Sequence, residues 1–548
     1  MSARPVTEVP FEVSRYPRAD APCGQAEAPD AEHDPYRGSI RRLIAPDATT
    51  VVIELCGPDV ALPARLAMPA FAINDTGWLT ANAEDGLGGP AIVRTTNGTG
   101  PFRLESWSGG AELSLVRSET YRGDDALPER IVVRWDDESG DRLAELNDSS
   151  VDGVDALGPA EAEIAGEDPE LLASTRTGLS TLYLGFNARF APFDAALVRQ
   201  ALAIGIDRDA LIADTFPPGS VVASHVAPCD LPYGCVGAPW PAYDPILARE
   251  WLAQANYEDG FRTTLRYSNE PRDYLPDPTA LALALQTQLR EDLGIEARLE
   301  VVDFETLVAS AEAGTLDGLH LLGARPRVAD VSAVLGPRFG AGASAEFGDL
   351  SEDLVAALQA GASTIDPAAR TAAYTTANDS IRALVPMVPI AHPAETIAAR
   401  ADVAGLLASP LGLESFATIV PGDRTQFVWM ESAEPAGVYC ADETGAAALR
   451  TCAQVGESLL AFKPGTAAVG PGLATACVPD ETLATWTCTL ESGVRFHDGA
   501  RLDASDVVTS LAAQWDAEHP LHVGRTSEFA TFAAQFGGFL NPPSSAGS

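Results

Sequence analysis

The stretch ESGVRFHDGARLDASDVV, residues 491–508, carries three consecutive local signals. Its first residues continue a strand-like alternation of apolar and polar side chains. Asp498-Gly499 then fits a tight turn, because glycine adopts the left-handed backbone conformation without strain. Asp503 is placed to cap the helix that follows, since its carboxylate can accept a free first-turn N–H, and Asp506 lies three positions beyond it. We therefore expect a strand, a turn and a capped helix.

The rest of the chain predicts a mixed α/β protein of two or three domains, because 548 residues exceed one simple core. Helix-like and strand-like periodicities alternate, and Gly294 is placed to end one long helix. No segment type occurs twice, so there is no internal repeat. We expect strands at 49–55, 129–137, 182–190, 295–303, 386–392, 426–432 and 485–496, a hairpin within 97–121, and helices within 61–71, 141–157, 194–216, 278–294, 366–385 and 443–462.

The charge of the chain is strongly negative. It has 77 acidic and 36 basic residues, for a formal net charge of −41, and Lys463 is its single lysine. Such a field repels nucleic acids and anionic membranes, so we expect no nucleic-acid partner.

Eight cysteines fall into pairs that are close in sequence, and each pair could close a short disulfide-bonded loop. Free buried thiols are the alternative, and a zinc site is disfavoured because there is no CxxC motif. Disulfides imply an oxidising compartment. No window of 18 apolar residues exists, and no export signal is visible at the N-terminus, which conflicts with that compartment. The candidate pairs are Cys23 with Cys56, Cys229 with Cys235, Cys440 with Cys452, and Cys477 with Cys488.

The opening stretch resembles the R-x-G-V-x-F-H-D-G-x-P-L-T-A-x-D-V-V signature of the dipeptide-, oligopeptide- and nickel-binding proteins of ABC transporters. Other segments resemble further stretches of this family, and together they span about 45–540. They are NGTGPFRLESW (97–107), VDGVDAL (151–157), YLGFNARFAPFDAALVRQALAIGIDRDALI (183–212) and LREDLGIEARLEVVDFETLV (289–308).

The order of these segments departs from the family, in which stretches like 421–543 precede stretches like 45–420. Circular permutation explains this rotation, because domain termini often lie close together and can be joined. The new junction at 417–427 contains Pro421 and Gly422, which suit a turn. A truncated protein that carries part of a second copy is the alternative.

The resemblance implies a periplasmic-binding-protein-like, two-lobed α/β clamp with an additional domain, in circularly permuted order, which closes on its ligand. On this basis we expect an N-terminal, partly disordered loop at 1–40, a small extra domain of lobe one at 41–95 and 456–548, the core of lobe one at 96–175 and 396–455, and lobe two at 176–395.

The loop of the family that lines the cleft resembles LLGARPRVADVSAVL (321–335). Arg327 stands where the family has an acidic residue that takes the amino end of the ligand, whereas Asp330 is retained. Because Arg pairs with carboxylate or phosphate, Arg325 and Arg327 could favour an anionic ligand group. The alternative is a solvated surface loop in an Arg-rich chain.

Five further residues are candidates for ligand contact. Asn187, Arg189 and Phe190 follow a strand that we place at the cleft-facing end of lobe two. Trp429 and Glu434 lie on the strand and turn that open the lobe-one segment, with packing as the alternative.

No residue is assigned to catalysis, a cofactor or a metal. His497 and Asp498 look catalytic, but the resemblance and the Asp-Gly pair assign them to a structural turn, and Trp486 is expected in the core. His519 and His522 could face one way on a helix, but Pro520 between them opposes a regular helix. Motifs of zinc peptidases, serine hydrolases and phosphate-binding loops are absent from the sequence.

The resemblance implies an extracytoplasmic component of an ABC importer that binds a peptide-like or other small organic solute between its lobes. It implies no enzyme activity, and a monomer that works with permease subunits. A secreted hydrolase on the same scaffold is one alternative, since acidic pairs are abundant. A relic or adaptor that binds no solute is the other.

Overall fold

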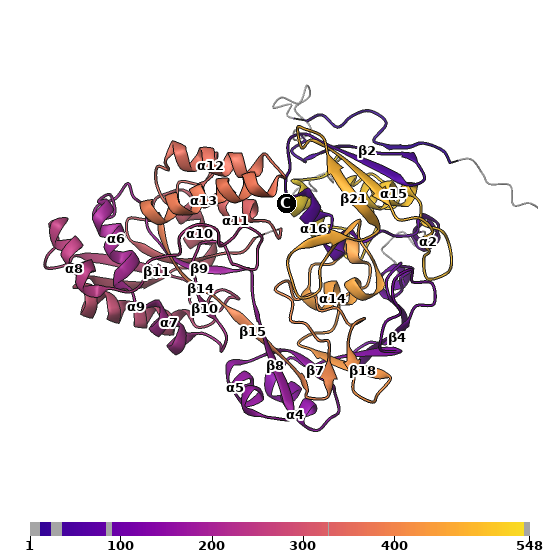
Figure 1. The fold of residues 1–548 in the computed structure, drawn as a ribbon, viewed down its shortest axis with the longest axis horizontal. Coiled ribbons are helices and arrows are strands. Elements are labelled where there is room, and N and C mark those ends of the chain that lie inside the picture. Colours follow the sequence, from indigo (N-terminus) through magenta and orange to yellow (C-terminus); the bar gives the residue numbers. More distant parts are fainter. Residues whose placement is uncertain (1–10, 24–35, 84–89, 327, 542–548) are drawn as a thin grey trace, which may run out of the picture.

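Three β-sheets organise the protein, and the segment from residue 426 onward contributes strands to two of them. The computed structural model describes residues 11–23, 36–83, 90–326 and 328–541. In the ribbon of Figure 1, the six-stranded sheet and its helices form one lobe, here lobe two. The five- and seven-stranded sheets lie together in the other lobe, here lobe one. The expected two-lobed α/β architecture is confirmed.

The five-stranded sheet is antiparallel and joins the two ends of the chain. β22 from the C-terminal region pairs with β3, so that Trp486 lies opposite Ile53, and both side chains are buried. The strand order is β1 (Ser14–Tyr16), β2 (Ile40–Asp47), β3 (Thr50–Leu55), β22 (Thr485–Leu490) and β21 (Ala474–Pro479). Beside it lie α1 (Leu62–Arg65), η1 (Pro69–Phe71), α2 (Thr76–Asn82), α3 (Pro90–Arg94), η2 (Cys440–Asp442), the hairpin β19 (Leu460–Phe462) and β20 (Val469–Pro471), α15 (Ala504–Trp515) and α16 (Ala530–Phe536).

The seven-stranded sheet also takes a strand from the C-terminal region. β18 runs parallel to both β6 and β7 and lies between them, so this late segment completes the centre of the sheet. The order is β4 (Phe102–Ser108), β5 (Glu112–Arg117), β6 (Arg130–Trp135), β18 (Gln426–Glu431), β7 (Gly153–Leu157), β15 (Ala394–Arg400) and β8 (Leu171–Thr177). The same part of lobe one contains α4 (Ser139–Asn147), α5 (Pro159–Glu167), α14 (Ala446–Val455), and the short strands β16 (Val403–Ala404) and β17 (Val420–Pro421).

Lobe two is built on the six-stranded sheet, and its large apolar core includes the buried strands β9, β13 and β14. The order is β10 (Val221–Val222), β14 (Met387–His392), β9 (Thr181–Gly185), β13 (Leu319–Ala324), β11 (Arg262–Tyr267) and β12 (Glu296–Val301). The helices are α6 (Ala196–Gly205), α7 (Arg208–Thr215), α8 (Pro245–Gln254), α9 (Pro278–Leu293), α10 (Phe304–Glu312), α11 (Val331–Phe339), α12 (Glu352–Ala362) and α13 (Pro367–Leu384).

The opening stretch of the sequence packs directly on the NGTGP motif near the other end of the chain. The backbone N–H of His497 donates to the carbonyl of Gly98, and its Nε2 donates to the carbonyl of Gly100 at 3.0 Å. Asp503 and Asp506 form the capping box of α15, and Gly499 has a φ of 93°. These segments therefore belong to one folded unit, although the rotated order and the domain boundaries remain predictions.

Local signals located most elements to within a few residues. Gly294 ends α9 with a φ of 69°, as expected. The helix expected over 443–462 is shorter, because α14 ends at Val455 with Gly456 as its C-cap, and β19 begins at Leu460. All eight cysteines are joined in the four pairs expected, Cys23–Cys56, Cys229–Cys235, Cys440–Cys452 and Cys477–Cys488.

Candidate functional site between the lobes

Two short connections join the lobes, and we call them the hinge. Residues 178–180 lead from β8 to β9, and Pro393 leads from β14 back to β15. The N–H of Gly178 donates to the carbonyl of Pro393 at 3.0 Å, so the two connections run side by side. Figure 1 shows β8 and β15 passing between the lobes. Two-stranded connections of this kind allow hinge closure around a ligand.

The hinge lies where the parallel strands of both sheets end. In lobe two, Ala324 at the end of β13 pairs with Thr181 at the start of β9. In lobe one, Leu157 at the end of β7 pairs with Thr396, near the start of β15. We call these the carboxyl edges of the two sheets. In open α/β sheets, ligands bind outside the carboxyl ends of the strands, so the space beside the hinge is the candidate site.

A buried network of charged side chains occupies the carboxyl edge of lobe one. Arg450 of α14 contacts Glu414 at 2.7 Å, Asp155 at 2.8 Å and Glu431 at 3.0 Å. Arg176 of β8 contacts Asp155 and Glu414, each at 2.8 Å. It also contacts Glu395 of β15 at 2.5 Å, so both strands that enter the hinge take part.

The acids of the network differ in how far nearby guanidinium groups compensate their negative charge. Burial alone would raise the pKa of Asp155 and Glu414, but the guanidinium groups of Arg450 and Arg176 hold both values below the usual range. Burial raises the pKa of Glu431 to about 7 despite the nearby Arg450. Among the residues that the structure describes, neither carboxylate oxygen of Glu431 has a hydrogen bond of good geometry, although Arg450 lies at ion-pair distance. Glu431 is therefore the least compensated acid of the network.

Sequence reasoning missed this network. Its signal is a charged residue within an otherwise apolar pattern, as in FVWME for Glu431 and AAALRTC for Arg450. Residues that are charged in a buried stripe are paired in nearly all folded proteins. The partners, however, come from segments far apart in the sequence.

The loop that follows β13 lies at the carboxyl edge of lobe two, and its contact with ligand stays a prediction. Arg325 is 76% exposed and pairs with Asp273 at 3.3 Å. Asp330 instead caps α11 and accepts from Arg370 at 2.9 and 3.1 Å, so its carboxylate has partners within lobe two. Arg327 lies outside the described residues.

Asn187, Arg189 and Phe190 lie at the opposite edge of the lobe-two sheet. β9 runs away from the hinge, because its last residue, Gly185, pairs with His320 near the start of β13. The amide of Asn187 is buried and donates to the carbonyl of Ala345 at 2.8 Å, while its Oδ1 accepts from the backbone of Arg189. The strand does not place these residues at the hinge side of lobe two, where we had expected them. Their contact with ligand stays a prediction.

Trp429 and Glu434 are separated in the structure. Trp429 is fully buried and packs against Phe416 and Phe427 in the lobe-one core. Glu434 lies just beyond the carboxyl end of β18, where it accepts from the indole N–H of Trp107 at 2.9 Å and from the backbone of Gly110 at 3.1 Å. Glu434 therefore holds the β4–β5 turn, at the end of the seven-stranded sheet farthest from the hinge strands β15 and β8.

Asp498 and His522, which we had considered for catalysis or metal binding, make hydrogen bonds within the fold. Asp498 accepts from the backbone of Ala500, in keeping with a turn. His522 hydrogen bonds through Nδ1 to the carbonyl of Ala513 at 2.7 Å. In the part of the chain that the structure describes, no group of three or more His, Cys, Asp or Glu residues is arranged to hold a metal ion. The described helices also include none that is both long and apolar enough to cross a membrane.

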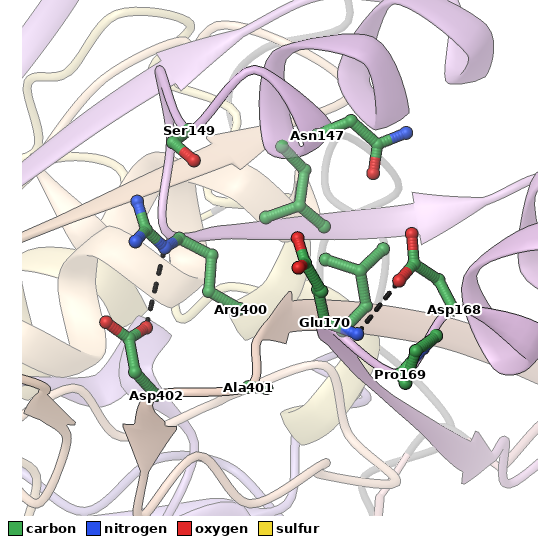
Figure 2. Close-up of a pocket in the computed structure, with 10 residues that line it drawn as sticks. Asn147, Ser149, Asp168, Pro169, Glu170, Arg400, Ala401 and Asp402 are labelled. Carbon is green, nitrogen blue, oxygen red and sulfur yellow. Dashed lines mark hydrogen bonds and ion pairs between the residues drawn. The ribbon is translucent and has the colours of Figure 1, made fainter.

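A separate surface pocket of about 430 Å³ lies on lobe one, at the edge of the seven-stranded sheet that faces away from the hinge. It is lined by the end of α4, the start of β8 and the end of β15. Figure 2 shows Arg400 paired with Asp402 on one side and Asp168 accepting from the backbone of Glu170 on the other. Arg400 and Asp402 are thus engaged with each other, and the pocket lies at the opposite edge of the sheet from the hinge.

Comparison with known proteins agrees with this architecture. The di/tripeptide-binding protein 1 of Pseudomonas aeruginosa is 26% identical over 391 residues, which cover 70% of this chain and 72% of that protein. The glutathione-binding protein GsiB of Salmonella choleraesuis is 29% identical over 270 residues, 48% of this chain. The match covers 50% of that relative, so the chain spans about half of its length.

Among solved structures, HbpA2 from Haemophilus parasuis superposes with a TM-score of 0.64 at 22% identity, and the match covers 70% of this chain and 76% of that one. This likeness supports the same fold. The family model of the bacterial extracellular solute-binding proteins, family 5 Middle, matches residues 19–345, which is more than half of the chain. The chain therefore belongs to the bacterial extracellular solute-binding proteins of family 5.

Proposed function

We propose that the protein binds a peptide-like solute between its lobes and delivers it to the permease of an ABC importer, outside the cytoplasm and as a monomer. The observation that carries the proposal is the meeting of two carboxyl edges at a two-stranded hinge. The names of the relatives support a peptide-like solute, since one binds di- and tripeptides and another binds glutathione. No relative among them favours a secreted hydrolase or an adaptor that binds nothing.

The two edges offer groups of opposite charge to a peptide. The exposed guanidinium of Arg325 on lobe two suits a carboxylate, because Arg pairs with carboxylates through parallel hydrogen bonds. On lobe one, Glu395 is 53% exposed beside the hinge and belongs to a network with four carboxylates and two guanidinium groups. Because carboxylates outnumber guanidinium groups in the network, it favours binding of an ammonium group. A zwitterionic peptide matches both edges at once.

Isothermal titration calorimetry of the purified protein tests this proposal. The probes are a set of di- and tripeptides, glutathione, and dicarboxylic acids that lack an amino group. We expect saturable binding of the peptides and no binding of the dicarboxylic acids. Absence of binding by every peptide and by glutathione would overturn the peptide proposal.

Arg325→Ala and a matched control locate the site. We expect Arg325→Ala to weaken peptide binding by about tenfold to a hundredfold, since a hydrogen bond to a charged group contributes about 1.5–3 kcal/mol. Arg262→Ala is the control, because Arg262 is 87% exposed and pairs with Glu296 at 2.8 Å at the start of β11, the other edge of the same sheet. Equal affinities of the two variants would exclude Arg325 from the site.

A further inference from the structure

The lobes also touch at a second place, away from the hinge. Val328 of lobe two is buried in one apolar cluster with Ala61 and Ala64, which lie at the start of α1 and within it. Ala333 of α11 and Val469 of β20 pack against the same cluster. Figure 1 shows α11 on the side of lobe two that faces the part of lobe one with the five-stranded sheet.

The β19–β20 hairpin of lobe one strengthens this contact. Ala467, in the turn of the hairpin, is 1% exposed and belongs to the apolar core cluster of lobe two. Phe462, at the end of β19, packs against the core clusters of both lobes. The hairpin therefore reaches from lobe one into lobe two, and the apolar surface that both sides bury favours the joined state.

Val328 belongs to the loop that follows β13, between Arg325 and Asp330. The loop is fixed to lobe two at both ends: Arg325 pairs with Asp273, and Asp330 pairs with Arg370, whose guanidinium stacks over the ring of Tyr233. Its buried neighbour Ala329 belongs to the core of lobe two, whereas Val328 projects into the cluster with Ala61. One short loop thus carries both a solute-facing charge and an inter-lobe contact.

We propose that Val328, with Ala61, Ala64 and the β19–β20 hairpin, forms a latch that holds the lobes closed and that couples the solute-facing loop to closure. The coupling rests on the function proposed above, but the latch does not. A solute that fixes the loop through Arg325 also fixes Val328 against lobe one. Binding and closure then favour each other, because the solute binds the closed state more tightly than the open state.

Small-angle X-ray scattering without solute tests the latch by itself. We expect Val328→Asp to increase the radius of gyration relative to the unaltered protein, because a carboxylate cannot be buried among alanine side chains without a partner. Val478→Asp is the control, since Val478 is 59% exposed on β21. Circular dichroism confirms that both variants are folded. Identical scattering curves for the two folded variants would overturn the latch.

A cross-link provides a second measurement if Val328→Asp does not fold. Ala64→Cys combined with Val328→Cys is expected to form an inter-lobe disulfide that peptide mapping detects, whereas Ala64→Cys with Val301→Cys is not, since Val301 is 54% exposed and lies outside the cluster. Failure of the first pair to cross-link would contradict the contact.

Calorimetry with the peptide that binds the unaltered protein tests the coupling. We expect Val328→Asp to raise its dissociation constant on the order of tenfold, because the closed state is populated less, and Val478→Asp to leave it unchanged. An increased radius of gyration with unchanged affinity would refute the coupling alone. A protein that binds no peptide, but opens in Val328→Asp, would refute only the proposed function.

Discussion

Arg450 and Glu414 meet at 2.7 Å inside lobe one, and neither side chain has any exposed surface. Arg450 also faces Asp155 and Glu431, so one guanidinium group neutralises part of three buried acids. Removing one member of a buried charge pair leaves the other without compensation, which costs more than the pair contributes by forming.

We therefore expect Arg450→Met to lower the free energy of unfolding by about 3–5 kcal/mol. Urea unfolding followed by circular dichroism measures this loss. Arg262→Met is the control, because its exposed pair with Glu296 is expected to change stability by less than about 1 kcal/mol. Similar unfolding midpoints for the two variants would show that the network contributes little to stability.

Glu431 predicts a pH dependence with a definite sign. Its pKa is about 7 in the folded protein, because burial disfavours the charged form, against 4.5 as its ordinary value. Between about pH 4.5 and about pH 7 the folded state keeps a proton that the unfolded state has released. The contribution of Glu431 to the free energy of unfolding therefore falls as the pH rises through this window, by roughly 3 kcal/mol in total.

Glu431→Gln removes this contribution, so its stability relative to the unaltered protein should rise by roughly 3 kcal/mol between about pH 4.5 and about pH 8. Comparing the variant with the unaltered protein is needed because buried histidines change the free energy of unfolding with pH in the opposite direction. Burial lowers the pKa of His392 to about 4, so that group adds stability as the pH rises to its ordinary value of 6.5. A difference between the two proteins that stays constant with pH would contradict the raised pKa of Glu431.

The sequence predicts the parts of this fold that local chemistry determines. Gly294 ends α9 in a left-handed backbone conformation, and the carboxylate of Asp503 caps α15. Both features depend only on residues that are close in sequence. The insertion of β18 between β6 and β7 depends on contacts across about 300 residues, and the family resemblance was its only signal.

The candidate site was predicted less completely, for the same reason. Arg325 lies at the carboxyl edge because its loop directly follows β13, and its contact with solute stays a prediction. Asn187 lies at the other edge, because the direction of β9 relative to the hinge depends on its pairing with β13. The ion pairs of Arg450 could not be predicted, because its acidic partners come from three separate segments of the chain.

Gly98 permits the close contact between the NGTGP loop and the end of α14. A Cβ atom at this position would lie 1.9 Å from the carbonyl oxygen of Val455, which is backbone and cannot move aside. We expect Gly98→Ala to destabilise the protein by about 1–3 kcal/mol, as overpacking of a core does. Thermal unfolding measures the loss, and Gly57→Ala is the control, since a Cβ there meets nothing within 4 Å. Equal melting temperatures would refute the contact.

The four disulfides differ in the length of chain that they close, and this predicts their order of importance. Cys23–Cys56 spans 33 residues, whereas Cys229–Cys235 spans 6. A cross-link stabilises mainly by restricting the unfolded chain, and the longer loop is restricted more, by about 4 kcal/mol against about 2 kcal/mol. We expect replacement of Cys23 and Cys56 by Ser to lower the urea unfolding midpoint more than replacement of Cys229 and Cys235. The reverse order would show that contacts in the folded state, rather than chain entropy, determine what each disulfide contributes.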